Sequence, residues 1–172
     1  MSSSLPEPWL RGPLPGIPAL LQPAAHALIM AKEDSLRAVE GLPTEALWAR
    51  PGGIASIGFH LAHLAGSTDR LLTYARGERL NEAQRMALAR EQTVDADRPP
   101  LAELLERWSD TVARALAQLA GTAESALLER REVGKARLPS TSMGLIFHAA
   151  EHASRHTGQI VTTAKLARGA AG

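Results

Sequence analysis

The chain carries, at residues 148–159, the sequence His148-Ala149-Ala150-Glu151-His152-Ala153-Ser154-Arg155-His156-Thr157-Gly158-Gln159. Its three histidines recur every four residues. Because successive residues of an α-helix rotate by about 100° and rise by about 1.5 Å, these histidines fall on one face, within an arc of about 80°. Two histidines four residues apart on a helix can clamp a metal ion. The stretch therefore predicts a helix with a metal-binding face.

The neighbours of the histidines indicate that part of this face points into a protein core. Apolar residues flank the histidines on one side of the helix, at Ile146, Ala149, Ala153, Ile160 and Ala164. Buried imidazoles need partners. His148 and His156 lie about 12 Å apart along such a helix, so all three histidines cannot hold one ion with tetrahedral or octahedral angles. A site would use two of the three and a residue from another helix, and the spacing leaves both adjacent pairs open.

A second histidine pair occurs in another segment of helical character, His60-Leu61-Ala62-His63. On a helix His60 and His63 are about 60° apart, so one of them can reach the axis of a helical bundle. Only His26 of the six histidines stands apart from the two clusters. Two helices that offer imidazoles suggest one shared site. The alternative is a metal-free core in which hydrogen bonds satisfy the histidines.

Helical periodicity extends over most of the chain. Apolar residues recur at helical spacing in four segments that glycine, proline and small polar residues delimit: 20–39 (or from Pro18), 56–77, 99–121 and 140–167. Ser56 is the predicted N-cap of the second segment, and Pro99-Pro100 suits the first turn of the third. Residues 81–92 fit either a short helix or a loop, and part of 122–139 can be helical.

The composition favours helix over sheet, because the chain is rich in alanine and leucine and only 3% aromatic. Four substantial helices predict an all-α protein, an antiparallel four-helix bundle that forms one domain over residues 1–172. The connection of about 20 residues between the second and third helices is long enough to cross the bundle. Five prolines predict an irregular leader over residues 1–18, packed through Trp9.

Charge and composition exclude several classes of function. The 19 Lys and Arg residues nearly balance 18 Asp and Glu residues and form no basic run, so nucleic acid is not an expected partner. The sequence shows neither a secretion signal nor about 18 uninterrupted apolar residues, so we expect a cytoplasmic protein without a membrane partner. The absence of cysteine excludes disulfides, thiol nucleophiles and cysteine-bound zinc. Any metal must be held by histidine and carboxylate.

On these residues the chain is identified as a member of the DinB-like (damage-inducible) superfamily of metal-binding four-helix bundles. Residues 56–72 resemble the family's second helix, which carries a single ligand histidine. The motif His148-xxx-His152-xxx-His156-Thr157-Gly158-Gln159 resembles its terminal helix, which usually ends in His-Arg-Gly-Gln. The resemblance implies metal ligands at His63, His152 and His156, with His148 in a supporting or pocket role.

Two positions depart from the family's pattern. Arg155 stands where many relatives have tyrosine, and Thr157 replaces the common arginine. These departures change the polar lining of the pocket, so a relative's substrate does not transfer to this chain. The ligand histidines are unaffected.

A centre of three neutral imidazoles suggests catalysis, because it leaves a divalent ion with open positions, whereas structural zinc sites are usually closed by four protein ligands. Zinc is the favoured metal, with nickel or iron as alternatives. Such an ion can generate a hydroxide from water or a thiolate from a thiol. Similarity to the superfamily's thiol-dependent branch implies transfer or isomerisation of a small-molecule substrate with a low-molecular-weight thiol, and a hydrolase is the nearest variant.

Further roles stay open at this point. The candidates for supporting or pocket residues are His60, His148 and Gln159, and the sequence assigns no general acid or base. A dimer of identical chains is expected, as is common in this superfamily. The alternative function is a non-enzymatic module that binds a metal or senses a small ligand and acts through a partner.

Overall fold

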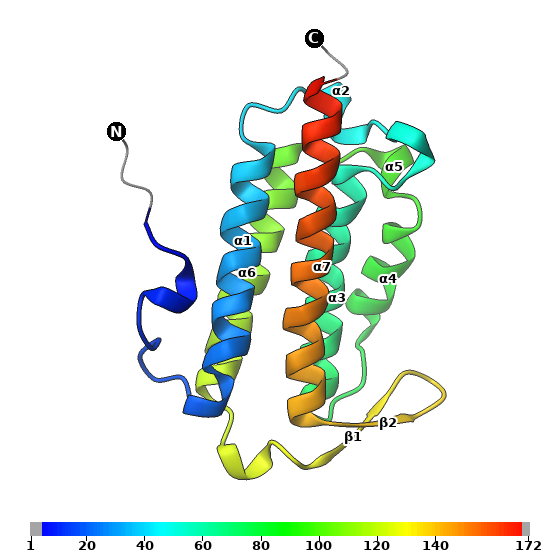
Figure 1. Cartoon of the computed structure of the whole chain (residues 1–172). Coiled ribbons are helices and arrows are strands. Elements are labelled where there is room, and N and C mark those ends of the chain that lie inside the picture. Colours follow the sequence, from blue (N-terminus) through cyan, green and yellow to red (C-terminus); the bar gives the residue numbers. More distant parts are fainter. Residues whose placement is uncertain (1–4, 170–172) are drawn as a thin grey trace.

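The computed structural model describes residues 5–169, and its main feature is a bundle of four long helices (Figure 1). They are α1 (Gln22–Val39), α3 (Ile57–Ala75), α6 (Leu101–Ala120) and α7 (Ser142–Gly169). Each begins and ends within two residues of a segment with helical periodicity, so the predicted all-α, four-helix class is confirmed. No helix in residues 5–169 combines the length and apolarity needed to cross a bilayer.

The helices are not all antiparallel to their neighbours. In Figure 1 the colour gradient shows α1 and α7 running upward, and α3 and α6 running downward. Helix α7 packs against α1 and α3, and α6 packs against the same two helices. The chain returns from α3 to α6 through α4 (Glu82–Glu91) and α5 (Val94–Asp97), which lie beside α3 (Figure 1). The predicted antiparallel pairing is therefore wrong for α1 with α7 and for α3 with α6, because this long connection crosses the bundle.

Local sequence signals account for several helix boundaries. The Ser56 hydroxyl caps α3 by accepting the backbone N–H of Phe59 at 3.0 Å, as predicted. Asn81 and Gln84 form a capping box at the start of α4, so the segment that fitted either a helix or a loop is a helix. Gly41 has a φ of 65°, a conformation that glycine adopts readily, and it turns the chain after α1 towards the short helix α2 (Thr44–Trp48).

The bundle core is mainly aliphatic and contains one fully buried tryptophan. Trp108 of α6 donates a 3.0 Å hydrogen bond from its indole nitrogen to the Ser35 hydroxyl of α1. On α7 the buried positions include the small residues Ala149 and Ala153. Small side chains let neighbouring helices approach closely. Helix α7 packs closely on α3, which brings the histidines of the two helices together.

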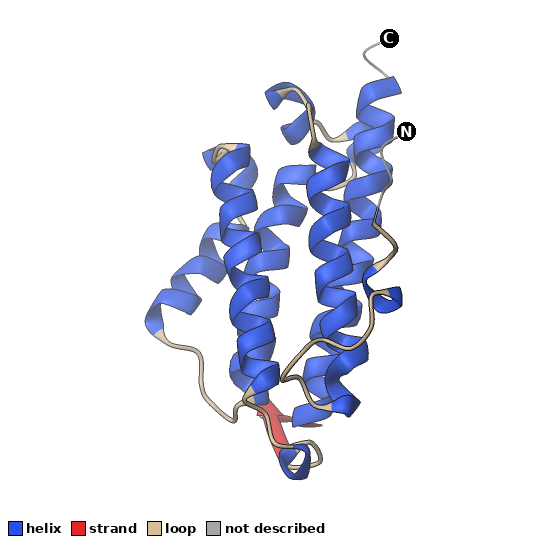
Figure 2. Ribbon diagram, turned by 90° about the vertical axis from the view of Figure 1, so that its left-hand side faces the viewer, coloured by secondary structure: helices blue, strands red, loops and turns tan. Residues whose placement is uncertain are grey.

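The connection between α6 and α7 contains a β-hairpin that the sequence analysis did not predict. Strands β1 (Arg130–Val133) and β2 (Leu138–Thr141) pair in antiparallel register at the foot of the bundle (Figure 2). Strands of four residues are too short to show a clear alternation of apolar and polar residues. The turn between them contains Gly134 and Arg137 at positive φ.

The proline-rich leader is irregular, as predicted, within its described part. It contains a single 3-10 turn, Pro8–Leu10, and residues 1–4 lie outside the described residues. The expectation that Trp9 packs the leader is wrong, because 58% of its surface is exposed. Leu14 and Ile17 pack against the core instead.

Candidate metal centre

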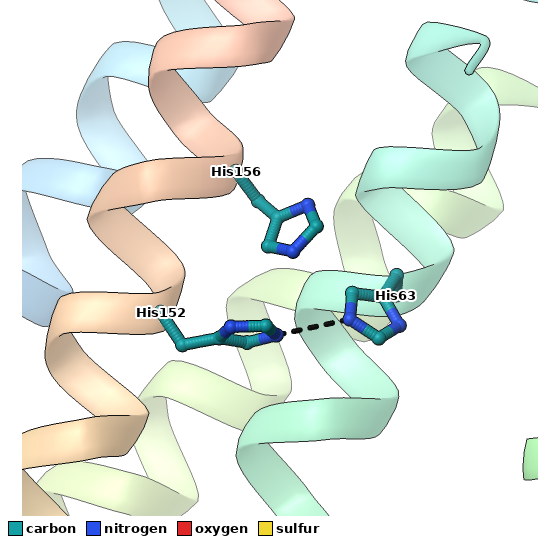
Figure 3. A group of neighbouring side chains, drawn as sticks. All are labelled: His63, His152 and His156. Carbon is teal, nitrogen blue, oxygen red and sulfur yellow. Dashed lines mark hydrogen bonds between the residues drawn. The ribbon is translucent and has the colours of Figure 1, made fainter. Parts of the chain in front are cut away.

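Three histidines from two helices meet between α3 and α7. His63 comes from α3, and His152 and His156 come from successive turns of α7 (Figure 3). The Nε2 atoms of His63 and His152 are 2.9 Å apart. One ring nitrogen of each histidine lies within 4.8 Å of the corresponding nitrogens of the other two. Within residues 5–169, this is the one cluster of His, Cys, Asp or Glu side chains with the geometry to hold a metal ion.

Helix periodicity and ring stacking position these side chains. The ring centroids of His152 and His156, one turn apart on α7, are 4.4 Å apart. The centroid of the His63 ring lies 5.1 Å from that of His152 and 4.6 Å from that of His156. Phe59, one turn before His63, stacks on its ring with an interplanar angle of 6° and a centroid distance of 5.6 Å. The stacked phenyl ring restricts rotation of the His63 imidazole.

Glu91, at the end of α4, orients His63. Its Oε2 accepts a 3.0 Å hydrogen bond from Nδ1 of His63. Arg70, two turns after His63 on α3, donates to both oxygens of the same carboxylate. Because an ionised carboxylate only accepts hydrogen bonds, a His63 ring that carries one proton carries it on Nδ1. The lone pair on Nε2 of His63 therefore faces His152 and His156, as in the carboxylate–histidine pairs of metal centres.

Gly66 makes room for this carboxylate. A Cβ atom at position 66 would overlap Oε1 of Glu91 and crowd the guanidinium of Arg70. Any other residue at this position would push Glu91 away from His63. The glycine is therefore part of the geometry that orients the histidine.

His60 contacts His156 in a comparable way. The Nδ1 atoms of the two rings are 2.9 Å apart, and His60 is 3% exposed. In a hydrogen bond between two neutral imidazoles, one nitrogen donates and the other accepts. With the proton on Nδ1 of His156, its Nε2 is unprotonated, and Figure 3 shows a ring nitrogen of His156 directed towards His63 and His152. His60 is then a partner of the cluster and not a member.

Burial lowers the pKa of three of these histidines, His60, His152 and His156. Desolvation, with repulsion from neighbouring histidines, lowers the pKa of His156 to about 3 and that of His60 to about 4. The same causes lower the pKa of His152. Burial alone would raise the pKa of Glu91, but hydrogen bonds from His63 and Arg70 outweigh it and lower that pKa. At neutral pH these groups are unprotonated imidazoles beside one ionised carboxylate.

Residues 27–160 match the sequence model of the DinB superfamily, and the match includes α3, most of α7 and the five histidines of the two clusters. The chain belongs to the DinB superfamily. The resemblance seen in the two histidine motifs is thereby confirmed. A comparison with curated proteins finds no match.

The donor set of this DinB protein fits a divalent metal ion. Hydrogen bonds alone do not satisfy the cluster, because Nδ1 of His152 is buried and has no hydrogen-bond partner in residues 5–169. Converging neutral imidazoles are the usual ligands of zinc and of related transition metals. The three histidines can therefore hold a divalent ion.

The other two predicted site residues lie outside the cluster. The side chain of His148 is 51% exposed, and its Nδ1 lies 3.3 Å from the carboxylate of Glu151. Its ring is 5.4 Å from that of His152, so it lies at the edge of the site. Gln159 is exposed on α7 and is not a member of the cluster.

Sequence analysis missed Glu91, Arg70 and Gly66. The signal available in the sequence is the capping box that starts at Asn81, which predicts α4. It does not show that α4 folds back along α3. The contact between Glu91 and His63 depends on that tertiary arrangement.

Proposed function

We propose that this protein is a metal-dependent enzyme in which His63, His152 and His156 bind a divalent cation that activates a small-molecule thiol or water. The observation that supports the proposal is the convergence of one nitrogen from each ring within 4.8 Å. Zinc is favoured because imidazole suits it and it imposes little geometric preference, and nickel or iron are the alternatives.

The chain's own residues prepare the three ligands. Glu91 holds the His63 ring with its lone pair towards the site. His60 does the same for His156 in the tautomer that has the shared proton on Nδ1 of His156. Imidazole binds a metal as a neutral ligand, so the three histidines would leave a bound divalent cation its positive charge, and such an ion would supply the Lewis acidity that lowers the pKa of a thiol or water. Arg70 neutralises the buried carboxylate of Glu91 from the side of α3.

The polar rim of the site lies on α7. His148 precedes His152 by one turn and is half exposed. Glu151 forms a two-oxygen ion pair with Arg155, whose Nη2 donates to Oε2 at 2.7 Å. We propose that this rim contacts the substrate, with His148 as the pocket residue nearest the metal ligands.

The proposed reaction is transfer or isomerisation with a low-molecular-weight thiol, with hydrolysis as the variant. The resemblance to the superfamily's thiol-dependent branch supports the thiol. Imidazole ligands suit a metal that activates either a thiol or water. Activity must therefore be tested both with thiol-dependent substrates and with substrates for hydrolysis.

The test is metal content and turnover in the same preparations. Metal is measured by mass spectrometry, and turnover is assayed with thiol–electrophile mixtures and with ester substrates. His152→Ala should lose both metal and turnover. The matched control is His26→Ala, since His26 lies outside the cluster, on the helix face that contacts the Gly12 carbonyl. Activity that is unchanged in metal-stripped protein would overturn the enzyme proposal.

A second candidate is a non-enzymatic module that binds a metal or senses a small ligand. The observation in its favour is that Glu91, the buried carboxylate beside the cluster, is fully engaged by His63 and Arg70 and does not serve as a free base. Such a module should lose thermal stability with a chelator yet show no saturable turnover in either assay.

We also propose a homodimer. The large apolar side chain of Phe147, next to His148, has 67% of its surface exposed. Light scattering should then give twice the chain mass of 18.3 kDa. The expected cytoplasmic location stays a prediction.

A further inference from the structure

A cavity of about 780 Å³ lies at the foot of the bundle. It is bounded by the end of α3, the connection to α4, α4 itself and the β1–β2 hairpin, which extends from the lower end of the bundle in Figure 1. Tyr74 lines it on α3, eleven residues after His63, which is about 16 Å along a helix. None of the clustered histidines lines this cavity, so it is distinct from the candidate metal centre.

Cationic side chains dominate its wall. Two carboxylates, Glu78 and Glu132, line the cavity against six cations, namely Arg79, Arg85, Arg130, Arg131, Lys135 and Arg137. The whole chain, by contrast, has 19 Lys and Arg residues against 18 Asp and Glu residues. Positive charge is therefore concentrated at this one place.

The two carboxylates neutralise little of that charge. Glu132 is shared between Arg137, at 2.5 Å, and Arg130, at 3.8 Å. Glu78 is engaged by Arg76, which does not line the cavity. Both carboxylates are thus already paired.

Among the described residues, three cations at the cavity have no carboxylate within ion-pair distance, although the charge of one of them, Arg79, still helps to lower the pKa of Glu132. Within residues 5–169, Arg79 and Lys135 form no ion pair. Arg85 donates to the backbone carbonyl of Leu80, which carries no net charge. An anion entering the cavity would meet guanidinium and ammonium groups without displacing a carboxylate.

Arg131 is held in place by contacts with α3 and with the chain around β1. Its Nε donates a 2.7 Å hydrogen bond to the Ala75 carbonyl, and its Nη2 pairs with Glu129 at 2.8 Å. Gly77 has a φ of 81° and lies directly against this guanidinium. The turn after α3 and the hairpin therefore form one preorganised wall.

We propose that this cavity is a second binding site, for small organic anions that carry phosphate or carboxylate groups on a short apolar body. Guanidinium groups bind both kinds of anion through paired hydrogen bonds. Tyr74, Leu80 and Leu88 supply an apolar part of the wall. The volume falls within the range of about 300 to 1,000 Å³ that is typical of small-molecule sites.

The test is calorimetric titration of the full-length protein with inorganic phosphate, phenyl phosphate and citrate. Phenyl phosphate should bind with saturation, more tightly than inorganic phosphate and more weakly as salt increases. The double variant R79Q/K135Q should weaken binding by about tenfold or more, because charge-assisted hydrogen bonds are lost. Its matched control is R90Q/K165Q, which makes the same charge change at exposed positions outside the cavity.

A third variant tests the apolar wall. Leu88→Ser should weaken phenyl phosphate and leave inorganic phosphate unchanged. Metal content and circular dichroism should stay at wild-type values in all variants, which keeps this test independent of the histidine cluster. Tighter binding of citrate than of phenyl phosphate would support the site with carboxylate as the preferred group.

Three results would overturn the proposal. The first is no saturable binding of any of the three probes, and the second is an equal loss in R79Q/K135Q and in the control. The third is binding of a single-stranded oligonucleotide that tightens with its length and exceeds that of phenyl phosphate, which would identify a nucleic-acid surface instead.

Discussion

The carboxylate of Glu91 occupies the space beside Gly66 that a side chain at that position would fill. Helix α4 approaches α3 closely enough for this contact because position 66 has no Cβ atom. The same contact places Glu91 within 3.0 Å of Nδ1 of His63. The orientation of one candidate metal ligand therefore depends on a glycine one turn away.

Gly66→Ala should displace Glu91 and weaken metal binding by about 10- to 100-fold, the usual effect of losing the hydrogen-bond partner of a ligand histidine. Metal affinity is measured by competition with a chromophoric chelator. Gly158→Ala on α7, where a Cβ meets nothing within 4 Å, is the matched control and should retain wild-type affinity. Equal affinities in the two variants would contradict the role of Gly66.

Glu91→Gln should weaken metal binding by about tenfold or more while preserving the fold, since an amide keeps the shape of the carboxylate but loses its charge. The variant also leaves Arg70 without its ion pair. Glu82→Gln, on the exposed start of the same helix, is the control. Wild-type affinity in Glu91→Gln would show that Glu91 does not support the metal ligand.

Substitutions on α7 distinguish the two histidine pairs that could bind the metal, His148 with His152 and His152 with His156. His156→Ala should abolish stoichiometric metal, whereas His148→Ala should retain it, because His148 is half exposed and outside the cluster. Metal per chain is measured by mass spectrometry after dialysis. Retention in His156→Ala with loss in His148→Ala would indicate the earlier pair.

The metal-free protein should lose stability as the pH falls from about 6.5 to 5. Burial lowers the pKa of His60 to about 4 and that of His156 to about 3, so in this window the unfolded chain binds more protons than the folded chain. The free energy of unfolding therefore decreases with decreasing pH. Urea titrations at each pH measure it, and His60→Gln should give a shallower dependence. A flat profile for the wild type would be inconsistent with neutral buried histidines.

Ser35→Ala should destabilise the bundle by about 1–3 kcal/mol, because it leaves the buried indole N–H of Trp108 without an acceptor. Urea denaturation gives the change in the free energy of unfolding. Ser125→Ala, at an exposed position, should change it by less than about 0.5 kcal/mol. Equal stability of the two variants would mean that the buried hydrogen bond contributes little.

Much of the fold was predictable because its signals are local. The spacing of apolar residues, the cap at Ser56 and the break at Gly41 depend on a few neighbouring residues, and the four long helices appear where these signals lie. The β-hairpin was not predictable in the same way, since strands of four residues are too short to show a clear alternation of apolar and polar residues. The length of the connection between α3 and α6 left their parallel packing open, but only the path of that connection in the structure decides it.

By itself, the sequence determined that His148, His152 and His156 share one face of a helix, because helical rotation follows from backbone geometry. Its resemblance to the DinB superfamily selected His63, His152 and His156. Only the tertiary structure decided that these three rings converge, that His60 pairs with His156, and that Glu91 and Arg70 complete the surroundings of His63. Those contacts join residues 21 to 96 positions apart, and the packing of whole helices, rather than any local pattern, brings them together.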